Sequence, residues 1–504
     1  MLAEGFVEQP PVATAGNARR AKHPLDCFTS HRPCLLSDGG ATPGGQDARR
    51  HNPLLRPAVS SSATIERMGH LVGKDLYRKL GQTIDGMPIR APWNETLYEI
   101  LSSLYTPEEA ALVVRMPLGM STVERIAKLT GEARPRLDGL LDGLCRKGLV
   151  IDVEIEGAYR YAIAPMVIGI FEFTMMRTDG GLDQGRMARL FHDYMSESGT
   201  LFHANFAAGE ETALLRTLPH EDTIRDRPHV EVLDYESATA LIEEASRFAM
   251  GLCSCRHEKQ HLGTRTCETP LDNCSSFDYA ADFVIRRGLA RVASRSEMLD
   301  NLARSRELGL VLNADNVQRH ATFICHCCAC CCNVIAGLTR FGYSNVVLTS
   351  SFMAASDPGP CKGCNFCAQA CPVHAITMAP DDDPGTERKK KPVVDESLCL
   401  GCGVCATRCR TGAMALVPRG QRVIPPETTF RRVILSALER GTLHNQLFDN
   451  PASLGQSFLR GLVGGFLRLP PVKRALLSRS LRSRFLAAME NAVRRQGNAW
   501  ATEL

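Results

Sequence analysis

Eight of the twenty-one cysteines form two copies of one short motif. The segments CKGCNFCAQAC and CLGCGVCATRC begin at Cys361 and Cys399, and each has the spacing C-x2-C-x2-C-x3-C. With this spacing, the first three thiolates of a motif bind one iron-sulfur cluster and the fourth binds the other cluster. The repeat therefore predicts two 4Fe-4S clusters. The expected ligands are Cys361, Cys364, Cys367 and Cys409 for the first cluster and Cys399, Cys402, Cys405 and Cys371 for the second.

Residues 356–418 around these motifs resemble the bacterial two-cluster ferredoxin. Pro372 follows the first motif as the family pattern expects, whereas Arg410 stands in the place of the second proline. Zinc is a weaker interpretation of the eight cysteines, because structural zinc takes four ligands from two pairs without a third C-x2 step. We expect short strands that shield the irons, formed by Ile376, Met378, Val393, Val394, Ala413 and Leu416.

A second concentration of cysteines lies at FICHCCACCCNVI, residues 323–335, with six cysteines in eight positions. Adjacent cysteines are poor disulfide partners, because their Cα atoms are closer together than a relaxed bridge requires. Cys325, Cys328 and Cys331 repeat the C-x2-C-x2-C step, but Ile335 stands where a fourth cysteine is needed. We expect a thiolate from residues 253–274 to complete a site here. The candidates are Cys253, Cys255, Cys267 and Cys274, with His257 and His261 nearby.

Three interpretations of this extra site stay open, namely a further iron-sulfur cluster, a zinc ion, or free redox-active thiols. Composition adds a constraint on the compartment. The N-terminus lacks a signal-peptide pattern and the chain lacks a run of 18 apolar residues. We therefore expect a cytoplasmic protein, in which thiols stay reduced unless a metal binds them. A formal net charge of +4 predicts no obligatory polyanion partner.

The sequence patterns around these cysteines predict an α+β chain with several domains. Helix-capping signals recur at Thr106 with Glu109 and at Ser121 with Glu124, and two strands are expected to turn at Glu156-Gly157. Three short helices and a hairpin resemble a winged helix-turn-helix. The expected parts are a disordered tail at 1–67, a winged-helix-like domain at 68–180, a helical cysteine-rich domain at 181–345, a ferredoxin-like module at 346–420 and a basic helical region at 421–504.

The winged-helix-like segment is not basic, which bears on its use. Residues 106–165 hold eight basic and nine acidic side chains, and Asp138 and Asp142 lie on the solvent side of the expected recognition helix. A DNA-binding domain should be basic here, so we favour a structural or protein-docking role and do not expect nucleic acid as a partner.

Two further helices, at 183–198 and 235–250, and a capping box at Ser294 with Glu297 indicate a helical middle. The cysteine segments on either side of it are expected to meet in space. The tail at 456–496 has nine basic residues and one acidic residue with apolar residues at helical spacing. Such a helix either packs on its own protein or a partner, which we favour, or lies on a membrane surface.

Residues 68–440 as a whole resemble large bacterial 4Fe-4S dicluster-domain proteins, on the segments TPEEAAL, CSCRHEK, PLDNC and FICHCC and the two ferredoxin motifs. The resemblance implies iron-sulfur electron transfer and names no substrate. We interpret the chain as an electron carrier or an oxidoreductase component that passes single electrons to a redox partner protein, rather than as a self-contained enzyme. The alternatives are a redox-responsive regulator that uses the winged helix, and an oxidoreductase component with a substrate site in the middle region.

Overall fold

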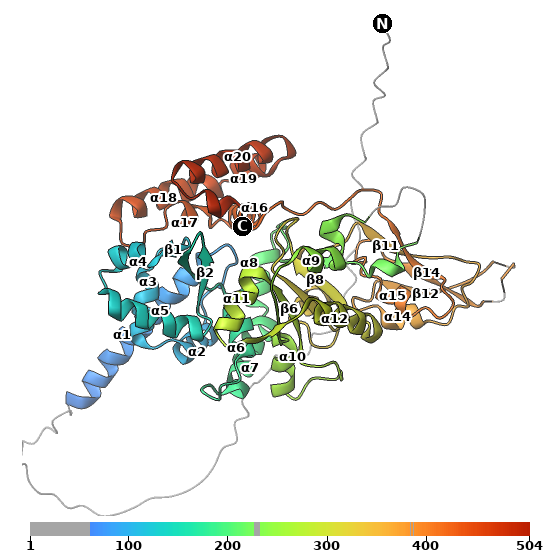
Figure 1. Cartoon of the computed structure of the whole chain (residues 1–504), viewed down its shortest axis with the longest axis horizontal. Coiled ribbons are helices and arrows are strands. Elements are labelled where there is room, and N and C mark those ends of the chain that lie inside the picture. The colour runs from blue at the N-terminus through green and yellow to red at the C-terminus, as the bar shows by residue number, and fades with distance from the viewer. Residues whose placement is uncertain (1–60, 226–231, 384, 387, 504) are drawn as a thin grey trace, which may run out of the picture. The chain divides into compact units, whose positions relative to one another are not determined.

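Five helices and a small sheet form the N-terminal part of the protein (Figure 1). The computed structural model describes residues 61–225, 232–383, 385–386 and 388–503, with side chains of the first helix from residue 73 onward. The sheet is antiparallel with the strand order β1-β3-β2. The elements are α1 (Ser61–Asp85), α2 (Glu95–Leu104), α3 (Pro107–Arg115), β1 (Ser121–Thr122), α4 (Val123–Thr130), α5 (Arg134–Arg146), β2 (Val150–Ile155) and β3 (Ala158–Ile163).

Capping explains where the helices of this part begin. The predicted capping box is present at α3, where the N–H of Glu109 donates to Thr106 Oγ1 and Glu109 accepts from the N–H of Thr106. The prediction for α4 was wrong by one residue, because Ser121 pairs with Tyr161 in the sheet and Thr122 is the cap. The helix and strand order is the one expected of a winged helix, and that assignment stays a prediction.

The disordered tail predicted for 1–67 lies mostly outside the described residues, which begin at residue 61. Its last seven residues belong to α1, so the helix begins before the expected boundary. Three short helices then lead to the middle of the chain, and α7 continues into a wider π-helical turn at Asp193–Glu197. These helices are α6 (Phe171–Met176), α7 (Gln184–His192) and α8 (Thr200–Phe206).

The middle of the chain is a seven-stranded sheet, so the prediction of a helical cysteine-rich domain was wrong. The order is β10-β4-β8-β9-β6-β5-β7, and every neighbouring pair is antiparallel except β10 with β4. The strands are β4 (Leu215–Leu218), β5 (Phe248–Leu252), β6 (Asp272–Phe277), β7 (Ala290–Ala293), β8 (Val311–Asp315), β9 (Phe323–Cys327) and β10 (Val347–Leu348). The helices are α9 (Ala238–Glu244), α10 (Ser254–His261), α11 (Asp278–Arg286), α12 (Arg295–Leu308) and α13 (Asn333–Phe341).

Burial of polar residues explains why these strands were missed. Strand β8 is VLNAD and β6 is DNCSSF, and most of their polar side chains are buried, so neither strand shows alternating polarity. Helices α9 and α12 contribute Leu241 and Met298 to one apolar cluster with the sheet, and α11 contributes Phe283 to another. As expected, the two cysteine segments meet, because β6 pairs with β9.

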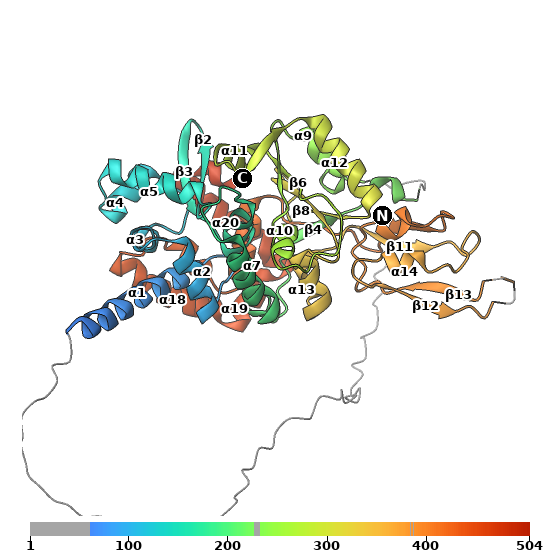
Figure 2. The ribbon, with the colours of Figure 1, turned by 90° about the horizontal axis from the view of Figure 1, so that it is seen from below.

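The ferredoxin-like part consists of two short strand pairs and two short helices (Figure 2). Strand β11 pairs with β14 and β12 pairs with β13, in both cases antiparallel. Val393 of β13 is 46% exposed, so the prediction that it shields an iron was wrong. The elements are β11 (Phe352–Ser356), α14 (Phe366–Ala370), β12 (Ile376–Pro380), β13 (Lys390–Val394), α15 (Val404–Thr407) and β14 (Met414–Pro418).

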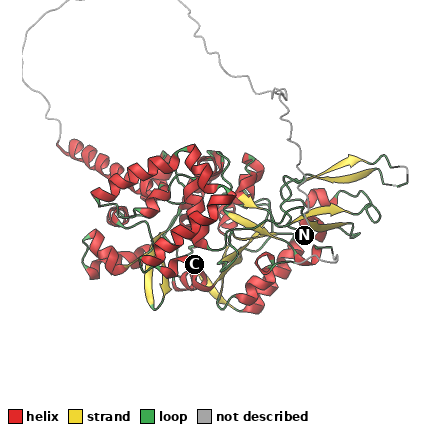
Figure 3. Cartoon of the chain, turned by 90° about the horizontal axis from the view of Figure 1, so that it is seen from above, coloured by secondary structure: helices red, strands yellow, loops and turns green. Residues whose placement is uncertain are grey.

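The C-terminal part is helical (Figure 3) and has its own apolar cluster, in which Leu438, Leu467 and Leu486 are buried. The predicted basic helices therefore pack partly on their own chain. Among the described helices, none combines the length and the apolar character needed to cross a bilayer. The helices are α16 (Thr429–Glu439), α17 (Leu443–Leu447), α18 (Leu454–Arg468), α19 (Pro470–Leu477) and α20 (Arg479–Arg495).

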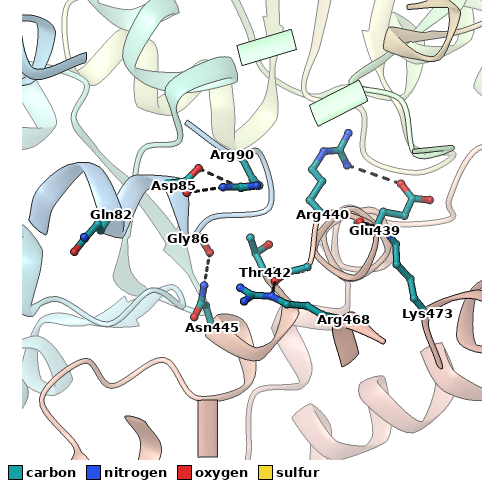
Figure 4. Close-up of a pocket in the computed structure, with 11 residues that line it drawn as sticks. Gln82, Asp85, Gly86, Arg90, Glu439, Arg440, Thr442, Asn445, Arg468 and Lys473 are labelled. Atoms are coloured by element: carbon teal, nitrogen blue, oxygen red, sulfur yellow. Dashed lines mark hydrogen bonds and ion pairs between the residues drawn. The ribbon is translucent and has the colours of Figure 1, made fainter. Parts of the chain in front are cut away.

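A polar cleft marks one contact between the C-terminal helices and the N-terminal part (Figure 4). The amide of Asn445 donates to the carbonyl of Gly86 at 3.0 Å. Arg90 is bound by Asp85 inside the cleft. A second contact joins Arg125 of α4 to Asp449 at 2.8 Å. These contacts fix the C-terminal helices against α1 and α4, and no cysteine lines the cleft.

Candidate iron-sulfur and metal centres

The four cysteines predicted for the second cluster line one cavity of the ferredoxin-like part. Cys399, Cys402 and Cys405 come from the second motif, and Cys371 comes from the end of the first motif. Apolar side chains close the rest of this cavity. They are Ala354, Val373, Ala375, Ile376, Leu400 and Leu416. Three thiols from one motif and one from the other therefore face a single apolar space.

The four cysteines predicted for the first cluster line a separate cavity, and here the fourth cysteine comes from the second motif. Cys361, Cys364 and Cys367 come from the first motif, and Cys409 comes from the end of the second motif. Near this cavity the guanidinium of Arg410 lies 4.7 Å from the centroid of the Phe366 ring. Arg410, which replaces the expected proline, thus ties the end of the second motif to α14 of the first.

Backbone amide groups point at sulfur atoms in both cavities. The N–H of Ala375 donates to Cys371 Sγ at 3.2 Å and the N–H of Met414 donates to Cys409 Sγ at 3.4 Å. The N–H of Ala354 donates to Cys399 Sγ at 3.5 Å. Hydrogen bonds to cluster sulfurs are one of the means by which a protein sets a cluster's reduction potential.

Glycines at matching positions of the two motifs allow a close backbone approach. Gly363 and Gly401 have φ angles of 67° and 71°. A Cβ atom on Gly363 would lie 2.4 Å from the carbonyl oxygen of Lys390, and one on Gly401 would lie 2.2 Å from that of Phe352. Each glycine thus lets its motif pack closely on a strand, and a Cβ atom at either position would clash with a strand carbonyl.

Burial makes these thiols poor anions unless a cation accompanies them. It raises the pKa of Cys402 to about 12 and also raises that of Cys371. Four thiolates in an apolar cavity require positive charge, which the irons of a cluster supply. The donor set, the apolar walls and the N–H groups thus fit a 4Fe-4S cluster in each cavity.

The seven cysteines predicted for the extra site belong to two different groups. Cys267 lies on the loop between α10 and β6, and Cys328, Cys330 and Cys331 lie on the turn between β9 and α13. The four Sγ atoms are all within 4.8 Å of one another. The expected contribution from 253–274 is therefore Cys267.

Cys325 is not part of this four-thiol site, and Cys330 was missed. Cys325 and Cys327 lie on β9, where side chains two residues apart point to the same face. The strand ends at Cys327, and Cys328 and Cys331 lie on the turn that follows it. The regular C-x2-C-x2-C spacing along the chain therefore does not place Cys325 next to Cys328 and Cys331. No alternation of buried and exposed residues marks 323–327 as a strand, so the sequence offers no local signal for this division.

Six further thiols lie close together at the same end of the sheet. We call them the six-thiol group. Cys274 contacts Cys325, Cys325 contacts Cys327, and Cys327 contacts Cys332. Hydrogen bonds from neighbouring thiols lower the pKa of Cys327 to about 6. The group consists of Cys253, Cys255, Cys274, Cys325, Cys327 and Cys332.

The histidines near these thiols have structural partners. His326 is buried between Ser275 and Ser305, and burial lowers its pKa to about 3, so it is neutral. His257 faces the carbonyl oxygen of Met175 at 2.6 Å through Nδ1 and His261 at 3.0 Å through Nε2. Neither His257 nor His261 joins the four-thiol site.

A cavity of about 420 Å³ borders the six-thiol group, a volume typical of small-molecule sites. All six of these cysteines line it, together with apolar side chains such as Val167, Phe171 and Phe202. Glu172 also faces it, and burial raises the pKa of this carboxyl group to about 7. The cavity combines apolar walls with a group that can exchange protons at neutral pH.

Comparison with known proteins identifies one region of the chain. Residues 360–413 match the family model of the 4Fe-4S dicluster domain, and both cysteine motifs fall within the match. No curated protein and no solved structure matches the chain. Residues 360–413 are thus a 4Fe-4S dicluster domain, which supports iron-sulfur cluster binding and iron-sulfur electron transfer.

Proposed function

We propose that the protein is a cytoplasmic electron-transfer protein that passes single electrons through two 4Fe-4S clusters, to or from a redox partner protein. The exchange of cysteines between the motifs carries this proposal. Cys371 joins the cavity of the second motif and Cys409 joins that of the first. Each cluster then ties the two halves of the domain together.

Iron and acid-labile sulfide in anaerobically purified full-length protein test this proposal. We expect about eight irons from these two clusters. Cys409→Ser should alter the electron paramagnetic resonance signal of the cluster that Cys361→Ser also alters. Cys371→Ser should instead affect the same signal as Cys399→Ser. Four or fewer irons per fully reconstituted chain would contradict the proposal. So would a result in which Cys371→Ser alters the same signal as Cys361→Ser, and Cys409→Ser the same signal as Cys399→Ser.

A chain of contacts leads from the second cluster cavity to the middle of the protein. The N–H of His220 donates to the carbonyl of Cys402 at 3.0 Å, and His220 Nε2 lies 2.8 Å from the carbonyl oxygen of Leu310. Leu310 packs against Cys328 and Cys331. Burial lowers the pKa of His220, so its ring is neutral and its Nε2–H donates to Leu310.

This chain of contacts favours a second candidate function, an oxidoreductase component that reduces an uncharged apolar molecule in the 420 Å³ cavity. For a quinone-like acceptor, two single electrons would come from the clusters and two protons from Glu172 and water, which gives the quinol. Menadione serves as the probe of this reaction. The reduced protein should be reoxidised by menadione, and Val167→Trp, which fills the cavity, should slow that step.

Val292→Trp is the matched control, because Val292 is 63% exposed on β7 and does not line the cavity. Equal reoxidation rates in the two variants would assign menadione reduction to the exposed edge of the ferredoxin-like part. The electron-carrier proposal would then stand without the cavity.

The regulator alternative is weakened by the charges of the winged-helix-like segment. Seven of its eight basic side chains are in ion pairs, including Arg134 with Asp138 and Arg125 with Asp449. Few positive charges remain for phosphate contacts. We expect duplex DNA to bind no more tightly than the non-specific micromolar range at physiological salt. Nanomolar, sequence-dependent binding in a gel-shift assay would favour the regulator instead.

A further inference from the structure

The four-thiol site has the dimensions of a site for one metal ion. Cys267 Sγ lies 3.7 Å from Cys328 Sγ and 3.8 Å from Cys331 Sγ, and Cys330 Sγ lies 3.4 Å from Cys331 Sγ. Tetrahedral zinc with bonds of about 2.3 Å places its thiolates about 3.8 Å apart. The observed spacing therefore agrees with a single zinc ion.

An iron-sulfur cluster would require a wider arrangement, because each thiolate binds a different iron at the outside of the cluster. The structure offers an internal comparison. Among the described residues, no three of the eight ferredoxin-like cysteines are gathered within 4.8 Å of one another, as the four-thiol site is. The two kinds of site thus differ in size within one chain.

The surroundings of the four-thiol site are built to hold it. Arg265 fixes the loop that carries Cys267, because its Nε donates to the carbonyl of Cys267 at 2.9 Å. The guanidinium of Arg256 is buried and contacts Cys328, while it also donates to Asn273 and to the carbonyl of His326. Positive charge beside four thiolates offsets the net negative charge of a zinc-thiolate site.

We propose that Cys267, Cys328, Cys330 and Cys331 bind one structural zinc ion that ties the 262–271 loop to the turn between β9 and α13. Cys328 and Cys331 also line the 420 Å³ cavity, so the ion stabilises one wall of it. The four ligands close the coordination shell, as in structural rather than catalytic zinc sites. The proposal is independent of the two clusters in 360–413.

Zinc and iron are measured separately in anaerobically purified full-length protein. We expect about one zinc per chain, lost in Cys267→Ser and in Cys330→Ser. Cys325→Ser, from the neighbouring six-thiol group, should keep its zinc and is the matched control. The iron content should be unchanged in Cys330→Ser. The iron content therefore tests the cluster proposal, and the zinc content tests the zinc proposal separately.

Limited trypsin digestion gives a readout that does not depend on metal content. Removal of zinc should release the loop and allow cleavage after Arg265, and added zinc should protect it. Cobalt-substituted protein should show the thiolate charge-transfer bands of a tetrahedral sulfur site. The proposal would be overturned if Cys330→Ser keeps its zinc. It would also be overturned if the wild-type protein contains no zinc and added cobalt does not change its absorption spectrum.

A separate feature, on α18, supports a second inference. Helix α18 buries Gly464 and Leu467 against its own chain. On the opposite side it carries large apolar side chains that are strongly exposed. These are Leu454 at 88%, Phe458 at 71%, Leu462 at 63% and Phe466 at 58%, followed by Leu469 at 48%. Their spacing places them in one stripe along the helix.

The two helices that follow α18 in the chain are positively charged. Arg474, Arg479, Arg482 and Arg484 are exposed on α19 and α20, and no described carboxylate forms an ion pair with them. The one acidic residue of 456–496, Glu490, is bound by Arg431 at 2.6 Å. An apolar stripe with unpaired basic neighbours matches an anionic lipid surface rather than an acidic or apolar protein surface alone.

We propose that α18 lies in the headgroup region of an anionic membrane and attaches the protein to it without crossing it. Full-length protein is sedimented with phosphatidylcholine vesicles with or without phosphatidylglycerol. Binding should require phosphatidylglycerol and weaken with salt. Replacing Phe458 and Leu462 together by Glu should weaken it at least about tenfold.

Ile424→Glu is the control, because Ile424 is 71% exposed outside the C-terminal helices. It should bind vesicles like the wild-type protein. If vesicles are not bound and ultracentrifugation finds a dimer that the double variant dissociates, the stripe contacts a second copy of the chain and the proposal is overturned. Equal binding by the double variant and the wild-type protein would also overturn it.

Discussion

At the scale of single residues, burial decides which ionisable groups are available for chemistry. Arg256 and His326 are buried and hydrogen-bonded to neighbouring groups, so they hold the cysteine segments in place. Glu172 is different, since its side chain accepts from the N–H of Gly169 at 2.7 Å and otherwise faces the cavity. Its side chain is half-buried, and no cationic side chain among the described residues forms an ion pair with it.

Replacement of Glu172 by Gln should therefore stabilise the protein at alkaline pH. Burial raises the pKa of Glu172 to about 7, so its stabilising contribution is complete below its usual pKa and is lost as pH rises through 7. The difference in free energy of unfolding between wild type and Glu172→Gln should grow by up to about 3 kcal/mol between pH 5 and pH 9. Anaerobic denaturant titrations measure it.

Glu154→Gln provides the control for this prediction. Glu154 is exposed on β2 and the same substitution there should leave the pH dependence of stability unchanged. A Glu172→Gln variant whose stability follows the wild-type pH profile would show that the carboxyl group is hydrated in the folded protein.

At the scale of elements, one buried carboxylate joins the N-terminal part to the middle sheet. Asp152 of β2 accepts from Arg287 through Oδ2 at 2.7 Å and through Oδ1 at 3.0 Å. Arg286 of α11 donates to the same Oδ2 and to the backbone carbonyl of Asp152. Burial opposes ionisation of Asp152, but the two arginines outweigh it and lower its pKa. Arg287 also binds Asp142 of α5.

Removal of this carboxylate should be costly. Asp152→Ala removes the carboxylate that two partly buried guanidinium groups share and leaves Arg287 with Asp142 alone, so we expect a loss of about 3 to 5 kcal/mol in stability. Asp138→Ala breaks an exposed pair with Arg134 and should cost less than about 1 kcal/mol. Urea unfolding of the two variants compares them, and equal losses would contradict the role given to Asp152.

At the scale of the whole molecule, His220 connects the ferredoxin-like part to the middle sheet. The two proposed cluster cavities lie in the ferredoxin-like part, and the four-thiol and six-thiol groups lie at one end of the middle sheet. Contacts through His220 and Leu310 join the two regions. The contact is close, because a Cβ atom on Gly403 would lie 2.4 Å from Thr223 Oγ1. The ferredoxin-like part is thus packed directly on the segment that carries His220.

His220→Leu should slow the reoxidation of reduced clusters by menadione while iron content and cluster spectra stay unchanged. The expected cause is loss of the hydrogen bond to the Leu310 carbonyl. The effect should vanish in the Val167→Trp background, in which the cavity is filled. His203→Leu, at a histidine bound to Tyr343, is the control and should react like the wild-type protein. An equal effect of His220→Leu in both backgrounds would place the electron exit elsewhere.

The sequence by itself determined which of the eight ferredoxin-like cysteines line each cavity, because the spacing within each motif fixes where its cysteines lie. It also determined the capping box at Thr106 and Glu109 and the turn at Glu156-Gly157, which are set by neighbouring residues. Local signals of this kind survive in a single sequence because both partners lie within a few positions of each other.

Only the tertiary structure decided how the middle cysteines are divided. Strand β9 is recognisable through its pairing with β6 and β8, since its buried Cys and His residues hide the alternation that predicts a strand. That pairing turns Cys325 toward the six-thiol group and leaves Cys328, Cys330 and Cys331 to meet Cys267, 61 to 64 residues earlier in the chain. Contacts over such separations depend on the sheet, and spacing along the chain does not encode them.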